Sequence, residues 1–249
     1  MKYLIHSEVY KTMKQKYFLI LMFIAAIIGV ITIGLNQLLV ISHPNIANTG
    51  SDIFVSSLSN ISICIIFCTI FIHFHIGSEF TNRTITIMME NGFSRKDIYL
   101  SKVIIVTFYC VGLMLVYSLV STLSATCLNG WGNNISIVNM IEDVFIFLIA
   151  NLSTLIICIV IEFLVESNTI SLIFNILLIG IGSEILLGIS KDIPVLEKIL
   201  EFAPISKIDL IGRTTMKTID LVNGVLVSII FGIVILLIGY CRFRKLDIK

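Results

Sequence analysis

Apolar residues fill six long runs along the chain, and polar residues gather in the segments between them. A helix needs about 20 apolar residues to cross the roughly 30 Å hydrocarbon core of a membrane, and each run is close to that length. The pattern therefore predicts a single all-α domain, residues 1–249, with six membrane-spanning helices. Their expected ranges are 17–41, 57–77, 103–127, 143–165, 170–189 and 221–241.

The composition supports an integral membrane protein. Hydrophobic residues make up 57% of the chain and charged residues only 13%, far from the balance of a soluble domain. The first apolar run follows a lysine-rich start, as in a secretory signal peptide. It is longer than the apolar region of such a peptide, and no small-x-small cleavage pattern follows. We therefore expect this run to be a membrane span.

Lysine and arginine lie in alternate connecting segments. The two termini and residues 77–102 are rich in them, whereas residues 42–56 and 128–142 contain none. The bias predicts a multi-pass plasma-membrane protein with both termini and residues 77–102 in the cytoplasm. Residues 190–220 are an exception, because this expected external loop also carries basic residues. Its apolar pattern predicts two short amphipathic helices before the last span.

Residues 1–16 combine an apolar pattern with four lysines. Such a segment is expected to form an amphipathic helix that lies in the membrane interface. A disordered basic tail is the alternative. The residues near helical spacing are Leu4, Ile5, Val9, Thr12 and Met13.

The longest polar interruption in the first two-thirds of the chain, residues 77–102, predicts two helices that meet at a sharp corner. The first is expected over residues 79–91, and Gly92 follows it where a left-handed turn commonly ends a helix. Ser94, with Asp97 three positions later, resembles a capping box that starts the next helix. The apolar side of the first helix would consist of Phe80, Ile85, Met88 and Met89.

The stretches EFTNRTI (79–85) and GFSRKDIYLSK (92–102) resemble the first cytoplasmic loop of type 2 permeases of ATP-binding-cassette (ABC) exporters. The layout is similar as well, with an amphipathic N-terminal helix, six spans and a partly helical external loop before the last span. The resemblance implies that residues 77–102 contain the coupling helix, which docks on the ATPase subunit. A solvated helical hairpin without a partner is the alternative reading of the same residues.

The same resemblance implies which side chains would contact the ATPase. Charged and apolar contacts of this kind set orientation more than they add affinity. The charged set is Glu79, Arg83, Glu90 and Arg95. The apolar set is Phe80, Met88, Met89 and Phe93.

The chain contains no GxxxxGK[ST] phosphate-binding loop, so we expect no ATP site and no enzymatic activity on it. The resemblance implies that ATP and Mg²⁺ bind a separate P-loop ATPase, present in two copies. Six spans are half of the expected pathway, which implies a second permease chain, identical or related. A net charge of +1 gives no reason to expect a nucleic-acid partner.

Relatives line their pathway with the second and fifth spans, and several residues there are candidates for this role. Ordinary helix packing explains each of them as well. His73 and His75 point in different directions on a helix, and Cys64 and Cys68 have no third ligand nearby, so no metal site is expected. The pathway candidates are Asn60, Phe67, Phe71, Asn175 and Glu184.

Small relatives of similar length often export antimicrobial or toxin peptides or confer self-immunity. The resemblance therefore implies an ATP-driven exporter in a bacterial plasma membrane, which moves amphipathic or hydrophobic peptides outward by alternating access. A passive channel or an ion-coupled carrier is the alternative. An intramembrane enzyme is disfavoured, because no catalytic residue set stands out in the spans.

Overall fold

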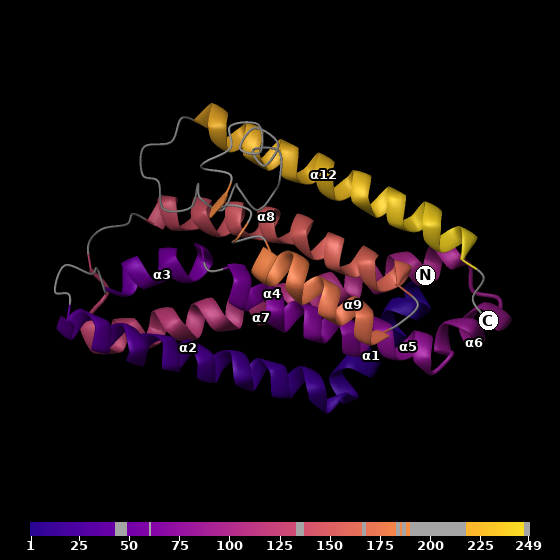
Figure 1. The fold of residues 1–249 in the computed structure, drawn as a ribbon, viewed down its shortest axis with the longest axis horizontal. Helices are drawn as coiled ribbons and strands as arrows, with labels where there is room; N and C mark the ends of the chain where they lie inside the picture. The colour runs from indigo at the N-terminus through magenta and orange to yellow at the C-terminus, as the bar shows by residue number, and fades with distance from the viewer. Residues whose placement is uncertain are drawn as a thin grey trace.

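The computed structural model is an elongated bundle of helices (Figure 1). It describes residues 1–42, 49–59, 61–132, 137–165, 168–182, 185, 188–189 and 218–246. The elements of the first half are α1 (Lys2–Lys14), α2 (Lys16–Ser42), α3 (Gly50–Ser59), α4 (Ile61–Ile72), the π-helix η1 (His73–Gly77), α5 (Ser78–Thr81) and α6 (Thr84–Glu90). The remaining elements are α7 (Arg95–Asn129), α8 (Ile137–Leu164), α9 (Asn168–Asn175), the π-helix η2 (Ile176–Ile181) and α12 (Thr218–Lys245).

Five of the six predicted spans correspond to helices long and apolar enough to cross a membrane, within the described part of the chain. The fifth expected span, 170–189, is represented by a shorter apolar helix, Thr169–Leu178, so a sixth span is not confirmed. The expected helices of the 190–220 loop lie outside the described residues. Several helices extend beyond their apolar runs: α3 already begins at Gly50, and α7 already begins at Arg95.

The long helices lie side by side, with α2 and α12 at opposite edges and α4, α7 and α8 between them (Figure 1). Most of the apolar side chains of α2 and α12 are exposed in the single chain. In a bilayer these faces are available to lipid or to another membrane protein. Helices α1, α5 and α6 and the end of α12 gather at one end of the bundle, which is called the charged end below.

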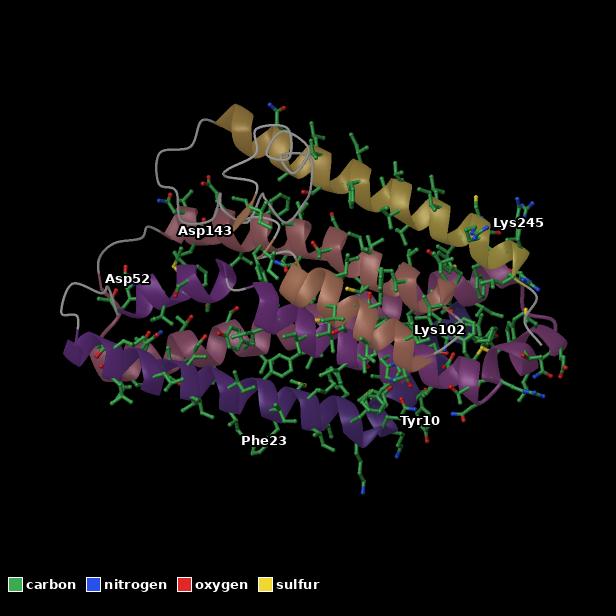
Figure 2. The ribbon with its side chains drawn as sticks, viewed as in Figure 1. Tyr10, Phe23, Asp52, Lys102, Asp143 and Lys245 are labelled. Atoms are coloured by element: carbon green, nitrogen blue, oxygen red, sulfur yellow. The ribbon has the colours of Figure 1, made fainter. Side chains whose placement is uncertain are left out.

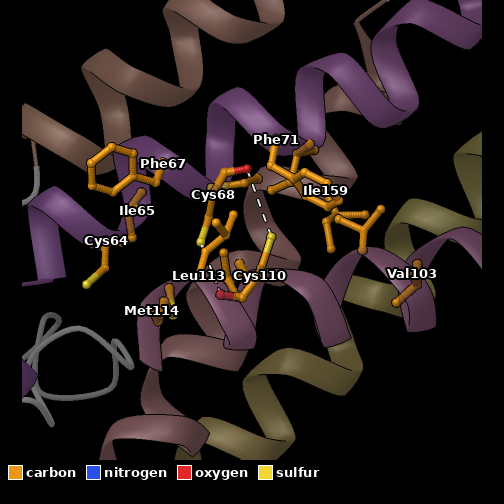
Figure 3. Packing of buried hydrophobic residues seen from close by; sticks show 14 of the residues in the cluster. Cys64, Ile65, Phe67, Cys68, Phe71, Val103, Cys110, Leu113, Met114 and Ile159 are labelled. Atoms are coloured by element: carbon orange, nitrogen blue, oxygen red, sulfur yellow. Dashed lines mark hydrogen bonds between the residues drawn. The ribbon is translucent and has the colours of Figure 1, made fainter. Parts of the chain in front are cut away.

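The core lies where α4, α7 and α8 cross (Figure 3). Cys68 and Cys110 are fully buried there, and each thiol contacts the backbone carbonyl of the other residue, at 3.6 and 4.0 Å. Small thiol side chains let the two helix backbones approach closely. Phe71 and Ile159 complete the packing from α4 and α8.

Small residues also determine how α12 packs. Ser153 of α8 donates a hydrogen bond to the carbonyl of Ser228, at 2.6 Å, and a Cβ on Gly232 would lie 3.2 Å from Ile156. Tyr99 of α7 donates its hydroxyl to the carbonyl of Leu236, at 3.1 Å. Ser228 and Gly232 of α12 therefore both lie close to α8.

Gly239 of α12 gives a test of this packing. An alanine Cβ there would lie 2.7 Å from both the Tyr99 hydroxyl and a Val160 methyl, and both of those side chains are buried. We expect Gly239→Ala to lower the free energy of unfolding by about 1–3 kcal/mol through overpacking. Thermal unfolding in detergent, followed by size-exclusion chromatography, measures the change.

Gly34→Ala is the matched control, because Gly34 lies in α2 and a Cβ added there would meet no neighbouring atom within 4 Å. Its better helix propensity should leave stability unchanged or raise it by up to about 1 kcal/mol. Equal unfolding midpoints for the two variants would contradict the close approach of α12 to α7 and α8.

Candidate functional site

The corner between α5 and α7 contains a break that the sequence does not predict. The single helix expected over residues 79–91 is wrong: α5 ends at Thr81 and α6 begins at Thr84. Between them Arg83 adopts a left-handed conformation, with φ of 55°, which is uncommon for a residue other than glycine. The break falls in the stretch TNRT, where threonine and asparagine are poor helix formers. α6 is therefore a separate helical segment.

The second half of the corner follows the prediction. Gly92 has φ of 85°, and the backbone N–H of Phe93 donates to the carbonyl of Met88 at 3.2 Å, as in a common helix ending. The Ser94 hydroxyl accepts a hydrogen bond from the backbone N–H of Asp97, at 3.1 Å, and so caps α7. These local contacts hold α6 between two defined turns.

Six of the eight corner residues predicted to contact an ATPase form two groups, and the other two, Glu79 and Arg95, are described below. Phe80, Met88 and Met89 pack partly against the core, and the Phe80 ring lies 5.9 Å from that of Phe163 in α8. The exposed group consists of Arg83, Glu90 and Phe93. The four exposed residues Arg83, Ile87, Glu90 and Phe93 are called the corner patch below.

Sequence reasoning missed Ile87 of the corner patch, which is 52% exposed. Ile85, two positions earlier, is fully buried. Residues two apart lie on nearly opposite sides of a helix, so both isoleucines cannot face the core. That spacing was the signal that one of them had to face outward.

Glu79 lies inside the protein and not on the surface of the corner. Its side chain is 2% exposed, and its Oε1 accepts hydrogen bonds from Lys102 of α7, at 2.5 Å, and from Lys11 of α1. Lys102 is fully buried and also contacts Glu8 of α1. Figure 2 shows Lys102 at the charged end of the bundle. Glu79 therefore joins the corner to α1 and α7.

His75 of η1 completes this group, which we call the buried ion cluster: Glu8, Lys11, His75, Glu79 and Lys102. The Nε2 atom of His75 lies 3.0 Å from Glu8 Oε2, an electrostatic contact without good hydrogen-bond alignment. The hydroxyl oxygen of Tyr17 lies 3.0 Å from the Nδ1 atom of His75. No sequence motif connects these residues, and only the fold brings them together.

The cluster determines the charge of Glu8. Burial by itself would raise the pKa of this carboxyl group, because it disfavours the charged form. The contact with His75 and the positive charge of Lys102 oppose burial and lower the pKa to about 2. Glu8 is therefore an anion at neutral pH, and Lys102 is shared between two carboxylates.

The two histidines of η1 point in different directions, as predicted. His73 turns away from the ion cluster, and its Nδ1 lies 3.2 Å from Oε1 of Glu162, a buried carboxylate of α8. π-helical turns are rare and often occur at functional sites. Here the π-helix contacts buried glutamates on two sides, one in α1 and one in α8.

Arg95 was predicted to contact an ATPase, but the structure gives it a partner within the chain. Its Nη1 atom donates to the carbonyl oxygens of Phe243, Arg244 and Leu246, at 3.1, 3.2 and 2.5 Å. Carbonyl groups at the end of a helix lack backbone partners and attract a cation. Arg95 therefore caps the end of α12 and connects it to the start of α7.

The three pathway candidates that the structure describes, Phe67, Phe71 and Asn175, are all buried in the single chain. Phe67 and Phe71 are buried in the core, and Phe71 contacts Tyr17, Phe18 and Tyr109. Asn175 is fully buried and donates to the carbonyl of Cys158, at 3.2 Å. Asn60 and Glu184 lie outside the described residues. Across the described ranges, no three His, Cys, Asp or Glu side chains are placed to hold a metal ion.

Lys102 gives a direct test of the buried ion cluster. Lys102→Met leaves two buried carboxylates without their shared cation, and breaking a buried pair in this way costs about 3–5 kcal/mol. Lys96→Met is the control, because Lys96 is exposed and its loss should change stability by less than about 0.5 kcal/mol. Denaturant unfolding in mixed micelles measures both. Equal midpoints for the two variants would show that the cluster is not formed in solution.

Comparison with known proteins adds the family. Residues 4–182 match the model of the ABC-2 family transporter proteins, a range that begins in α1 and includes the corner and the buried ion cluster. No curated protein matches the chain. Membrane subunits of this family typically lack an ATPase domain and generally pair with ATPase subunits. The chain belongs to the ABC-2 family and is the membrane component of an ABC-2 type transporter.

Proposed function

We propose that this chain is the permease subunit of an ATP-driven exporter and that the corner patch docks on the ATPase. The supporting observation is the construction of the corner: α6 is held between two defined turns, while a mixed charged and apolar surface is left open. A connecting loop needs no such construction. A patch with an exposed isoleucine, a phenylalanine and two opposite charges suits a protein partner.

The corner contacts the rest of the molecule at several points, so a movement imposed on α6 would reach the long helices. The chain continues from α5 through η1 into α4, and Glu79 contacts Lys102 of α7. Phe80 contacts Phe163 of α8, and Arg95 holds the end of α12. In this proposal ATP and Mg²⁺ bind the ATPase, and its closure displaces the corner toward the core.

The working unit in this proposal contains two permease chains and two ATPase subunits. The wide apolar faces of α2 and α12 are open in the single chain, and a second permease, identical or related, would cover part of them. We propose that the corner lies on the cytoplasmic side of a bacterial plasma membrane; the Lys/Arg bias of the connecting segments supports this side. We propose that Asn175 and the other pathway candidates approach the transport pathway only at the interface between the two permease chains.

We propose an amphipathic or hydrophobic peptide as cargo, of the antimicrobial, toxin or immunity type. The support is the resemblance of the chain to small exporters of this kind, together with spans whose exposed side chains are almost entirely apolar. A cargo that is itself amphipathic can enter from the inner leaflet without a large set of hydrogen-bonding groups.

Docking can be tested by reversing charge on the corner patch. Arg83→Glu combined with Glu90→Arg should reduce the ATPase recovered with the affinity-purified chain by at least about tenfold, or about 1.4 kcal/mol. Both residues are exposed, so the variant should fold normally. The measurement is purification from native membranes in mild detergent, with quantitative mass spectrometry of the proteins that accompany the chain.

Arg242→Glu is the control for this experiment, because Arg242 is exposed at the same end of the bundle but lies on α12. It should recover as much ATPase as the wild type. Unchanged recovery for the double variant would exclude the corner patch as the docking surface. Repeated purification without any P-loop ATPase would contradict the proposed function itself.

Cargo movement can be tested with the complete complex in vesicles. A fluorescent amphipathic peptide should accumulate on one side when ATP is added, and the accumulation should fall to background when the ATPase carries a substitution that abolishes hydrolysis. Transport that is unaffected by this substitution would contradict an ATP-driven exporter. Ion conductance without nucleotide would support a channel instead.

A further inference from the structure

Helix α1 presents a basic and aromatic face to the outside, which its contacts with the bundle do not use. Leu4, Glu8 and Thr12 face inward and are buried. Met13, nine positions after Leu4 and therefore on the opposite side of the helix, is 70% exposed. The inward face is partly polar because it contributes Glu8 to the buried ion cluster. The residues of the outer face are Lys2, Tyr3, His6, Tyr10, Met13 and Lys14.

The outer face carries no acidic side chain. Glu8 is the only acidic residue among positions 1–16, and it is buried against Lys102. Lys11 forms an ion pair with Glu79. Lys2, Lys14 and Lys16 are exposed, and no neighbouring carboxylate of α1 offsets their charge. Because Glu8 faces inward, the charged side chains on the outer face of α1 are all basic.

The position of α1 determines what this surface can reach. Only Gln15 separates α1 from the candidate span that begins at Lys16, so the last turn of α1 is next to the start of that span. Tyr3 and Tyr10 are 87% and 63% exposed, and the Lys14 ammonium lies 5.7 Å from the centre of the Tyr10 ring. Exposed tyrosines, a methionine and lysines form the usual composition of a segment at the level of lipid headgroups.

We propose that Lys2 and Lys14 on the outer face of α1, together with Lys16 at the start of α2, bind anionic phospholipid headgroups of the adjacent leaflet. The three ammonium groups complement phosphate charge, and Tyr10 and Met13 enter the boundary between headgroups and acyl chains. Because the inner face of the same helix holds Glu8 against Lys102 and His75, lipid binding stabilises α1 in the position that completes the buried ion cluster. This inference does not depend on the identity of the cargo or the ATPase.

The test uses local fluorescence quenching. Trp131 is the only tryptophan, so Trp131→Phe combined with Tyr10→Trp places a single reporter on the outer face of α1. The full chain is reconstituted in phosphatidylcholine vesicles containing equal mole fractions of either brominated phosphatidylglycerol or brominated phosphatidylcholine, with bromine near the headgroup end of the acyl chains. We expect the anionic quencher to be at least about twice as effective, because lysines near the membrane surface attract anionic lipid.

Lys2→Gln, Lys14→Gln and Lys16→Gln together should reduce the ratio of the two quenching efficiencies to about one. The matched control neutralises Arg242, Arg244 and Lys245, the exposed basic residues at the end of α12, and should leave the ratio unchanged. Variants are compared only when they elute like the wild type from size-exclusion chromatography.

Three outcomes would overturn the proposal. Equal quenching by both lipids in the reporter chain would remove the anionic preference. A ratio lowered by the α12 variant and not by the α1 variant would assign the preference elsewhere. Absence of quenching by either lipid, with protection of the reporter only when the ATPase subunit is added, would make this face a protein interface.

Discussion

The buried ammonium of Lys102 is the interaction on which the charged end of the bundle depends. A charged group can be placed away from water only with partners of opposite charge, and Lys102 has no exposed surface. Its two partners, Glu8 and Glu79, come from α1 and α5. The position of the N-terminal helix, the end of the second span and the start of α7 are therefore determined together. The N-terminal helix is thereby joined to the bundle by charged groups as well as by the buried Leu4.

This arrangement separates the internal role of the corner from its external role. Glu79, Phe80 and Arg95 were all expected at a docking surface, yet each has a partner within the chain: Lys102, Phe163 and the end of α12. The corner patch remains outside. Residues that contact the core and residues that remain exposed alternate over a few positions, so a short segment can hold its shape and still offer a surface. A docking partner would then meet a preformed corner and would not have to order it.

The sequence predicted five of the spans and the second turn of the corner because both depend on local information. Run length defines a span, and Gly92, Ser94 and Asp97 specify a turn and a cap within six residues. The pairing of Glu8 with Lys102 joins residues 94 positions apart, and no local pattern signals it. The break at Arg83 was missed because the apolar spacing of Phe80, Ile85 and Met88 fits one continuous helix. Arg95 was assigned to the surface because its acceptors are backbone carbonyls, which leave no mark in the sequence.

The π-helix η1 explains how one segment can contact buried carboxylates on two sides. Histidines two positions apart already point away from each other, and the contacts place His73 on Glu162 of α8 and His75 on Glu8 of α1. An ordinary surface loop at this point would leave both carboxylates without these partners. Along the chain, η1 lies between the core helix α4 and α5, the first helix of the corner. A displacement of α5 toward α4 would therefore move both histidines of η1 and change both contacts. The end of the second span is thus connected to α8 through His73 and to α1 through His75, so these three helices meet at η1.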